Sequence, residues 1–181
     1  MARRFDSIEK NHEEFVKRQH VFFVATARTE GIVGLSPKGM DTMRIIGPNS
    51  VVWLNLTGSG NETSLNVQDN GRMTVMFCSF DKDPLVLRFY GKATVVHPRD
   101  AEWSDLIPMF GEFAGARQIF SMKVDIVMES CGYAVPYLEY KGERDLLTKW
   151  TESRGRAGVE KYWKEYNALS LDGRKTNIVE E

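Results

Sequence analysis

The sequence predicts a mainly β (α+β) fold, in which about six or seven short antiparallel strands, broken by small helices, close or nearly close into a barrel. Two observations indicate this fold. Short runs rich in β-branched and aromatic residues recur along residues 20–128, and Gly, Pro, Asn or Asp separate them. No long helical pattern interrupts the first strands of this region.

Length and composition are typical of one globular domain over residues 1–181. The hydrophobic fraction of 42% and the aromatic fraction of 11% exclude a disordered chain. No apolar run approaches the length of about 20 residues that spans a bilayer. The N-terminus lacks the apolar segment of a secretory signal, so we expect a cytoplasmic protein without a membrane partner.

Charge and ligand-type residues exclude two further classes of function. With 24 basic and 25 acidic residues, the chain has a net charge of −1, which predicts no nucleic-acid partner. Cys78 and Cys131 are expected to be reduced. The histidines His12, His20 and His97 have no ligand spacing, so we expect no metal site.

The elements follow in chain order. Residues 7–18 predict a surface helix with a narrow apolar stripe. Gly91, in the middle of the longest strand, suggests a bulge or a sharp bend. A short helix is expected from Pro98 to about Met109. The barrel strands, of which the first two form a hairpin, are predicted at residues 21–27, 32–35, 43–46, 51–56, 73–78, 85–96 and 118–127.

The C-terminal part differs in kind, since residues 144–168 predict helices that break at Gly155. An aromatic stripe at helical spacing is formed by Val159, Tyr162, Trp163 and Tyr166. We expect this stripe to pack against the barrel or a partner subunit. Residues 170–181 are expected to form an extended tail.

The loop from Thr57 to Thr63 is the strongest candidate for a binding site. It joins an apolar strand to a helix start through two glycines, which leaves backbone N–H groups free to hold an anion such as a cofactor phosphate. Ser59, Asn61 and Thr63 would add side-chain donors. The alternative is a purely structural capping box between Ser59 and Glu62, and the two interpretations are compatible.

Two cations are further candidates. Lys38 lies on a Pro-Lys-Gly turn, where it could pair with a phosphate or a reduced flavin, or simply be solvated. Arg88 lies on an apolar strand, where an inward guanidinium would need an anion. Cys131 has no adjacent base, and no Ser/His/Asp set is present in a nucleophile context, so hydrolytic catalysis is not expected.

The order of these segments, roughly from Phe15 to Trp150, resembles the pyridoxamine 5′-phosphate oxidase-like family of FMN-binding split-barrel flavoproteins. The resemblance implies a homodimer with FMN at the subunit interface and a small-molecule substrate. The segments that carry it are Ser36-Pro37-Lys38-Gly39, the loop after residue 56, Asn70-Gly71-Arg72 and Leu87-Arg88-Phe89-Tyr90-Gly91-Lys92-Ala93. The strings Gly58-Ser59-Gly60-Asn61-Glu62-Thr63 and Ser130-Cys131-Gly132-Tyr133-Ala134-Val135-Pro136 resemble a less characterised branch.

The resemblance and the loop chemistry together assign ten expected cofactor-binding residues: Ser36, Lys38, Gly39, Leu56, Thr57, Ser59, Gly60, Asn61, Thr63 and Arg88. Three departures argue against the vitamin oxidase itself. Asn61, Glu62 and Thr63 stand at the family's phosphate-binding Ser-Arg-Lys, so Glu62 would repel a phosphate unless it turns away. Val86 replaces a flavin-contacting glutamine, and the C-terminal motif for pyridoxal phosphate is not found.

The expected function is therefore that of an FMN-dependent oxidoreductase with an unidentified substrate and no assigned catalytic residue. The alternative is a carrier or sensor of FMN, deazaflavin or haem on the same fold, with His20 or His97 as a haem ligand. A third alternative is a barrel that has lost its cofactor, which Glu62 and Val86 would explain.

Overall fold

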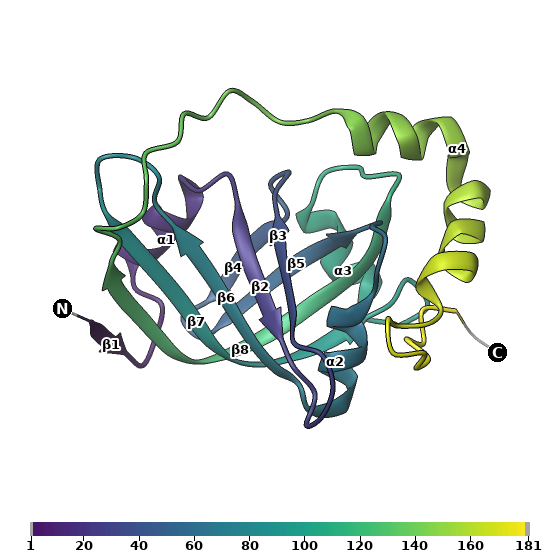
Figure 1. Ribbon diagram of the computed structural model, residues 1–181, viewed down its shortest axis with the longest axis horizontal. Coiled ribbons are helices and arrows are strands. Elements are labelled where there is room, and N and C mark those ends of the chain that lie inside the picture. Colours follow the sequence, from purple (N-terminus) through teal and green to yellow (C-terminus); the bar gives the residue numbers. More distant parts are fainter. Residues whose placement is uncertain (1, 180–181) are drawn as a thin grey trace.

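An eight-stranded antiparallel sheet forms the centre of the molecule in the computed structural model, which describes residues 2–179 (Figure 1). The mainly β, antiparallel fold predicted from the sequence is confirmed. Its elements are β1 (Arg3–Phe5), α1 (Lys10–Lys17), β2 (Phe22–Thr26), β3 (Gly34–Lys38), β4 (Met43–Gly47), β5 (Ser50–Leu56), α2 (Glu62–Asn70), β6 (Arg72–Cys78), β7 (Leu85–Val96), α3 (Trp103–Leu106), a 3₁₀ turn (Ile107–Met109), β8 (Ala116–Cys131), α4 (Leu146–Tyr162) and a π-helical turn (Trp163–Asn167).

The sheet is curled but not closed. Its strands follow the order β3-β2-β6-β7-β8-β5-β4, so β3 and β4 are its two edges, and β1 pairs with β8 outside this path. The sequence predicted six or seven strands rather than eight because it missed β1. This three-residue strand carries Arg3 and Arg4 and has no apolar pattern of its own.

The apolar core lies inside the curl of the sheet. Alternate residues of β2 are buried, which is the period of a strand with one face inward. Strand β5 is buried on both faces, because Trp53 faces the main core, where its ring stacks on Phe120 at 4.5 Å between centroids, while Leu54 faces a second cluster beside α3. This double burial holds the end of β5 firmly at the candidate site.

Gly91 marks a bulge, as expected. The register between β7 and β8 shifts between Tyr90 and Gly91. A Cβ atom at Gly91 would lie 1.9 Å from the carbonyl oxygen of Lys123, so only glycine lets the two strands approach this closely.

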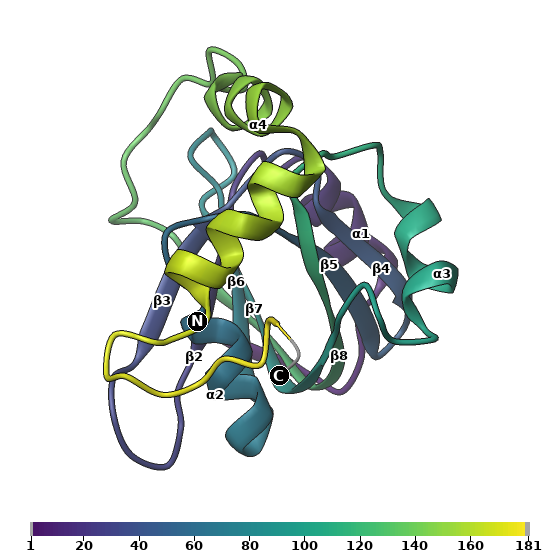
Figure 2. The same cartoon turned by 90° about the vertical axis from the view of Figure 1, so that its right-hand side faces the viewer.

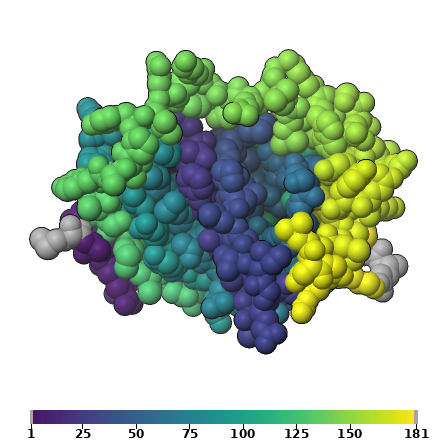
Figure 3. All heavy atoms as spheres, in the orientation of Figure 1, coloured from purple at the N-terminus to yellow at the C-terminus, as the bar shows by residue number. Residues whose placement is uncertain are grey.

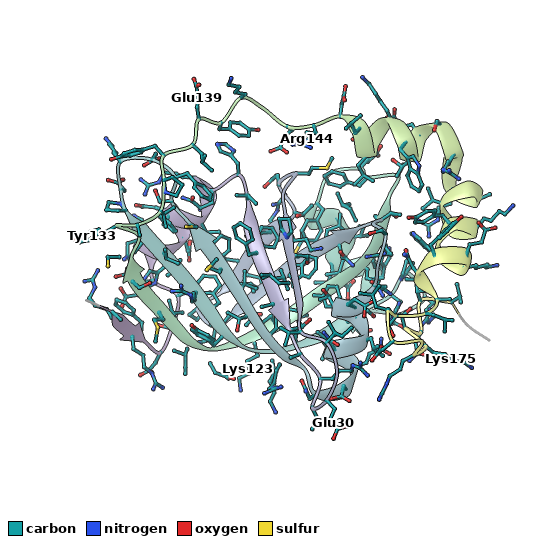
Figure 4. The ribbon with its side chains drawn as sticks, viewed as in Figure 1. Glu30, Lys123, Tyr133, Glu139, Arg144 and Lys175 are labelled. Atoms are coloured by element: carbon teal, nitrogen blue, oxygen red, sulfur yellow. The ribbon has the colours of Figure 1, made fainter. Side chains whose placement is uncertain are left out.

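The chain leaves β8 in an irregular arch over residues 132–145 that reaches α4 on the other side of the sheet (Figures 1 and 2). Tyr133, Glu139 and Arg144 lie along this arch (Figure 4). The helix α4 breaks at Gly155, whose φ of 63° is left-handed. In the predicted aromatic stripe, Val159 and Trp163 are buried, whereas Tyr166 is 59% exposed.

The segment after Ser170 is not the extended tail that the sequence predicted, as far as residue 179; residues 180 and 181 lie outside the described part. It turns back, buries Thr176 and Ile178, and places Asp172 in an ion pair with Arg28. Figure 3 shows this yellow segment beside the blue β2–β3 region. We call residues 146–179 the C-terminal arm.

The described residues include neither a membrane-spanning helix nor a metal-binding cluster. No helix within residues 2–179 combines the length and the apolar character needed to cross a bilayer. Over the same residues, no group of three or more His, Cys, Asp and Glu side chains is placed to hold a metal ion. Cys78 and Cys131 are free thiols, the first buried and the second exposed.

Candidate functional site

A cavity of about 490 Å³ lies between β3, the end of β5 and the start of α2. Three other cavities around the described residues have volumes of about 340, 350 and 110 Å³. The lining of the first cavity includes nine of the ten predicted cofactor-binding residues, namely Ser36, Lys38, Gly39, Leu56, Thr57, Ser59, Gly60, Asn61 and Thr63. The tenth, Arg88, does not line it.

The helix α2 begins later than the capping-box interpretation requires. Its first residue is Glu62 and its N-cap is Asn61, so Ser59 is not the cap, and no side chain caps the helix. The carboxylate of Glu62 instead accepts a hydrogen bond from the backbone N–H of Leu171 at 3.1 Å. The predicted capping box is therefore wrong. The Glu62 carboxylate accepts from the C-terminal arm rather than from the N–H of Ser59.

We call residues 57–61 the anion loop, and the carbonyl groups of Gly58, Ser59 and Gly60 lie on one side of it. The carbonyl oxygens of Gly58 and Gly60 accept from the Nη1 of Arg117 at 3.4 and 3.0 Å, and that of Ser59 accepts from Asn167 at 3.3 Å. The N–H of a trans peptide points opposite to its carbonyl, so the N–H groups of residues 59–61 face away from Arg117. Within residues 2–179, the N–H groups from Ser59 to Thr63 donate to no protein acceptor.

Side chains of the loop divide into satisfied and unsatisfied groups. The hydroxyl of Thr57 donates to the carbonyl of Gly115 and accepts from the indole N–H of Trp163, both at 2.9 Å, so it supports the loop. Asn61 is only 2% exposed, yet neither atom of its amide has a hydrogen-bond partner among the described residues. A buried amide in this state is a ready partner for a ligand.

Lys38 enters the cavity from β3. Its strand alternates between half-buried and exposed residues, which puts Ser36 and Lys38 on the same face. Burial, and then the charge of Arg117, lower the pKa of Lys38 to about 8. Its ammonium lies 5.4 Å from the ring centroid of Trp53, and no carboxylate of the described chain pairs with it.

Arg117 is the residue that sequence reasoning missed. The register of β5 and β8 pairs Asn55 with Gln118 but Leu56 with Ala116, so Arg117 is the extra residue of a β-bulge, which turns its side chain toward the anion loop. It is 3% exposed, and burial lowers its pKa to about 10, so it is charged at neutral pH. The predicted strand began at residue 118, and a bulge set by the partner strand leaves no local sequence signal.

Arg88 lies elsewhere on the sheet. It is half-buried on β7, and its Nη1 donates to the hydroxyl of Ser130 at 2.9 Å. This contact satisfies one of its donors without an anion. Arg88 is therefore not brought together with the loop within one chain.

The histidines are also placed away from this cavity. His12 is fully buried and contacts the carboxylate of Glu129 at 3.1 Å, and His20 stacks on Tyr140 at 3.5 Å between ring centroids. His97 is 5% exposed, and burial lowers its pKa to about 4. None of the three lines the cavity, so a haem there would lack a histidine ligand from its own chain.

Comparisons with known proteins agree with this architecture. A protein called ustO, from Aspergillus flavus and described as a pyridoxamine 5′-phosphate oxidase family protein, is 31% identical over 187 aligned positions, which cover 93% of this chain and 75% of that protein. A variant of HupZ from Group A Streptococcus superposes with a TM-score of 0.56 at 20% identity, covering 68% of this chain and 99% of the other. HutZ, the haem storage protein of Vibrio cholerae, gives a TM-score of 0.50 at 14% identity, covering 70% and 97%.

The structural likenesses are too remote in sequence to show more than the fold. The sequence matches are stronger. The family described as pyridoxamine 5′-phosphate oxidase matches residues 8–131, which is most of the chain and includes every strand from β2 to β8. With the 31% identical relative, this match shows that the chain belongs to the pyridoxamine 5′-phosphate oxidase family.

Proposed function

We propose that this protein binds FMN in the cavity at the anion loop and acts as an oxidoreductase on a small molecule. One observation carries the proposal: an array of free N–H groups, the half-buried ammonium of Lys38 and the buried guanidinium of Arg117 surround a cavity. Glu62 supplies the only carboxylate among the described residues of its lining, and it pairs with neither cation. Such a site is complementary to a dianionic phosphate.

The residues present fit the phosphate end of FMN. The N–H groups of Ser59 to Thr63, the hydroxyls of Ser59 and Thr63, and the orphaned amide of Asn61 are available as donors. Glu62 does not oppose them directly, because its carboxylate is held by the arm at Leu171. Bound FMN would supply hydride or electron transfer, and Lys38 would stabilise negative charge on it.

A homodimer belongs to the same proposal. Ile32 and Val33, just before β3, and Leu35 within it line the cavity and are 52%, 67% and 69% exposed. Exposed apolar residues at the mouth of a site are typical of a surface that a second chain covers. Sedimentation should give twice the mass of the chain, and a monomer at micromolar concentration would contradict this part.

A cytoplasmic location is likewise proposed, and cell fractionation tests it.

The first experiment is the absorption spectrum of the purified protein, followed by a fluorescence titration with FMN. We expect flavin bands or, after removal of any bound flavin, saturable quenching of FMN fluorescence. Thr63→Ala should weaken binding, because it removes a hydroxyl that no described residue engages, whereas Arg72→Met, at the start of β6 and outside the cavity lining, should not. A colourless protein that quenches no FMN fluorescence would refute the proposal.

A non-catalytic carrier is the second candidate, and the lining favours it in one respect. Lys38, Glu62 and Arg117 are the only ionisable side chains among the described residues of the cavity wall. In the proposed complex the two cations serve the flavin and its phosphate, and the carboxylate of Glu62 is held at Leu171, which leaves no further side chain of this lining as a general acid or base. Oxidation of NADH or NADPH by the FMN-loaded protein separates the two: turnover supports the enzyme, and stable binding without turnover supports the carrier. A Soret band instead would indicate haem.

A further inference from the structure

We propose that Arg117 and Asn167 are positioning residues that together build the phosphate site of this chain. They act through the peptides of the anion loop and make a phosphate monoester the group that the cavity selects. The inference rests on the proposed function and extends it to the C-terminal arm, which lies outside the family-matched residues 8–131.

The two side chains form one unit behind the loop. The Nη1 of Arg117 donates to the amide oxygen of Asn167 at 2.7 Å, and the amide nitrogen of Asn167 donates to the carbonyl of Gly58 at 3.0 Å. Asn167 is fully buried. Since its oxygen accepts from one partner and its nitrogen donates to the loop, its orientation is fixed, and hydrophobic replacements cannot reproduce either contact.

This unit determines which way the loop peptides face. Three successive carbonyl groups, of Gly58, Ser59 and Gly60, accept from Arg117 or Asn167. If these contacts were lost, each peptide could rotate and turn its carbonyl, rather than its N–H, toward the ligand. A carbonyl oxygen facing a dianion would weaken binding, so the contacts select the conformation that binds phosphate.

Arg117 also supplies charge where the loop has none. The two positions after Asn61 carry Glu62 and Thr63, so the loop itself has no cation. Within residues 2–179 no carboxylate pairs with Arg117, and its Nε is buried without a partner. A buried guanidinium without a counter-ion is costly, and an anion bound at the loop would offset that cost.

Two hydrogen bonds besides those of Asn167 join the C-terminal arm to the anion loop and to the start of α2. Trp163 donates to the hydroxyl of Thr57, and Leu171 donates to Glu62. All three contacts come from the stretch of nine residues that begins at Trp163. Docking of the arm and binding of phosphate are therefore coupled, because both require the same loop conformation.

The test compares FMN with riboflavin, which lacks the phosphate, in Arg117→Met and Asn167→Leu. Met keeps the unbranched stem of the arginine side chain to about the position of Nε and removes the buried charge, so this variant should fold. We expect each substitution to weaken FMN about tenfold or more while riboflavin affinity changes by less than about twofold. Arg72→Met is the matched control, since Arg72 also donates to two loop carbonyls, of Ala27 and Arg28, but outside the cavity.

Two results would overturn the inference. Unchanged FMN affinity in both variants would show that the unit does not act on the phosphate. A proportional loss for both flavins would show a merely structural role.

The effect of inorganic phosphate on the Tm tests this inference separately from the proposed function. If the starting protein binds neither flavin, the proposed function fails. The inference then survives only if phosphate raises the Tm of the starting protein and of Arg72→Met, but not that of Arg117→Met or Asn167→Leu.

Discussion

Replacing Lys38 by Met is expected to stabilise the ligand-free protein and to weaken its binding of FMN. The ammonium is held in the cavity close to the charge of Arg117, and no carboxylate of residues 2–179 forms an ion pair with it. Such a group destabilises the fold and is useful only when an anion binds. Met retains the apolar stem of the side chain and removes the charge.

The magnitude follows from the pKa. Burial and Arg117 lower the pKa of Lys38 from 10.5 to about 8. Each unit corresponds to about 1.4 kcal/mol, so the charged form costs about 3 kcal/mol at pH 7. The contact of the ammonium with the ring of Trp53 returns about 0.5–1 kcal/mol. The variant should therefore unfold with a free energy about 2 kcal/mol higher at pH 7.

The pH dependence of the stability difference between Lys38→Met and the starting protein tests the sign of this effect independently. Between about pH 8 and 10.5 the folded protein has released the proton of Lys38, whereas the unfolded chain still holds it. The unfolded state binds more protons in this range, so the stability of the starting protein rises with pH relative to the variant. The advantage of Lys38→Met should shrink above pH 8 and vanish above about pH 10.5.

Urea unfolding at pH 7 and pH 9.5, without ligand and at one protein concentration, measures both effects. Lys123→Met, at an exposed position on β8, is the control and should change stability by less than about 0.5 kcal/mol. An FMN titration at pH 7 should show weaker binding by Lys38→Met. The reasoning is refuted if Lys38→Met is less stable than the starting protein at pH 7, or if its advantage does not fall with pH.

Three further substitutions test other parts of the structure. Glu62→Gln should strengthen FMN binding about twofold to tenfold, because it removes a negative charge beside the loop while its amide oxygen can still accept from Leu171, and weaker binding in a titration would contradict this. Gly91→Ala should lower the free energy of unfolding by more than about 3 kcal/mol, because its Cβ would clash with the backbone of Lys123; a near-normal thermal midpoint would show that the bulge can relax. Glu129→Gln should cost about 1–3 kcal/mol in urea unfolding, because it removes the charged acceptor of a buried contact between the N-terminal segment and β8, and an unchanged midpoint would count against that contact.

Most strands could be predicted from sequence because their apolar residues follow the period of a half-buried sheet. The strand β2 is an example, with its alternating burial from Phe22 to Thr26. The strand β1 could not be predicted, since its only reason to be extended is its pairing with residues 127–129 of β8. Local pattern rules have no access to such a partner.

The start of α2 shows the same limit at the site itself. A serine three residues before a glutamate is a local signal for a helix cap, and the sequence contains it at Ser59 and Glu62. In the structure the glutamate accepts instead from Leu171, which is 109 residues away in sequence. The N–H of Leu171, a donor distant in sequence, thus takes the place of the local N–H of Ser59, and the helix begins at Glu62.

The donors of the anion loop can be predicted from the sequence, whereas their orientation cannot. Its donors, the N–H groups after a glycine turn, are visible in the local sequence, and all the residues predicted there line the cavity. Their orientation depends on Arg117 and Asn167, which lie 57 and 108 or 109 residues from the carbonyls of Gly60, Ser59 and Gly58 that they bind. A glycine-rich turn without such partners could present either face of its peptides. In the proposed site, binding specificity therefore depends on the place behind the loop where the bulge in β8 meets the π-helical turn of the C-terminal arm, and an account from the family-matched segment alone would leave out half of that unit.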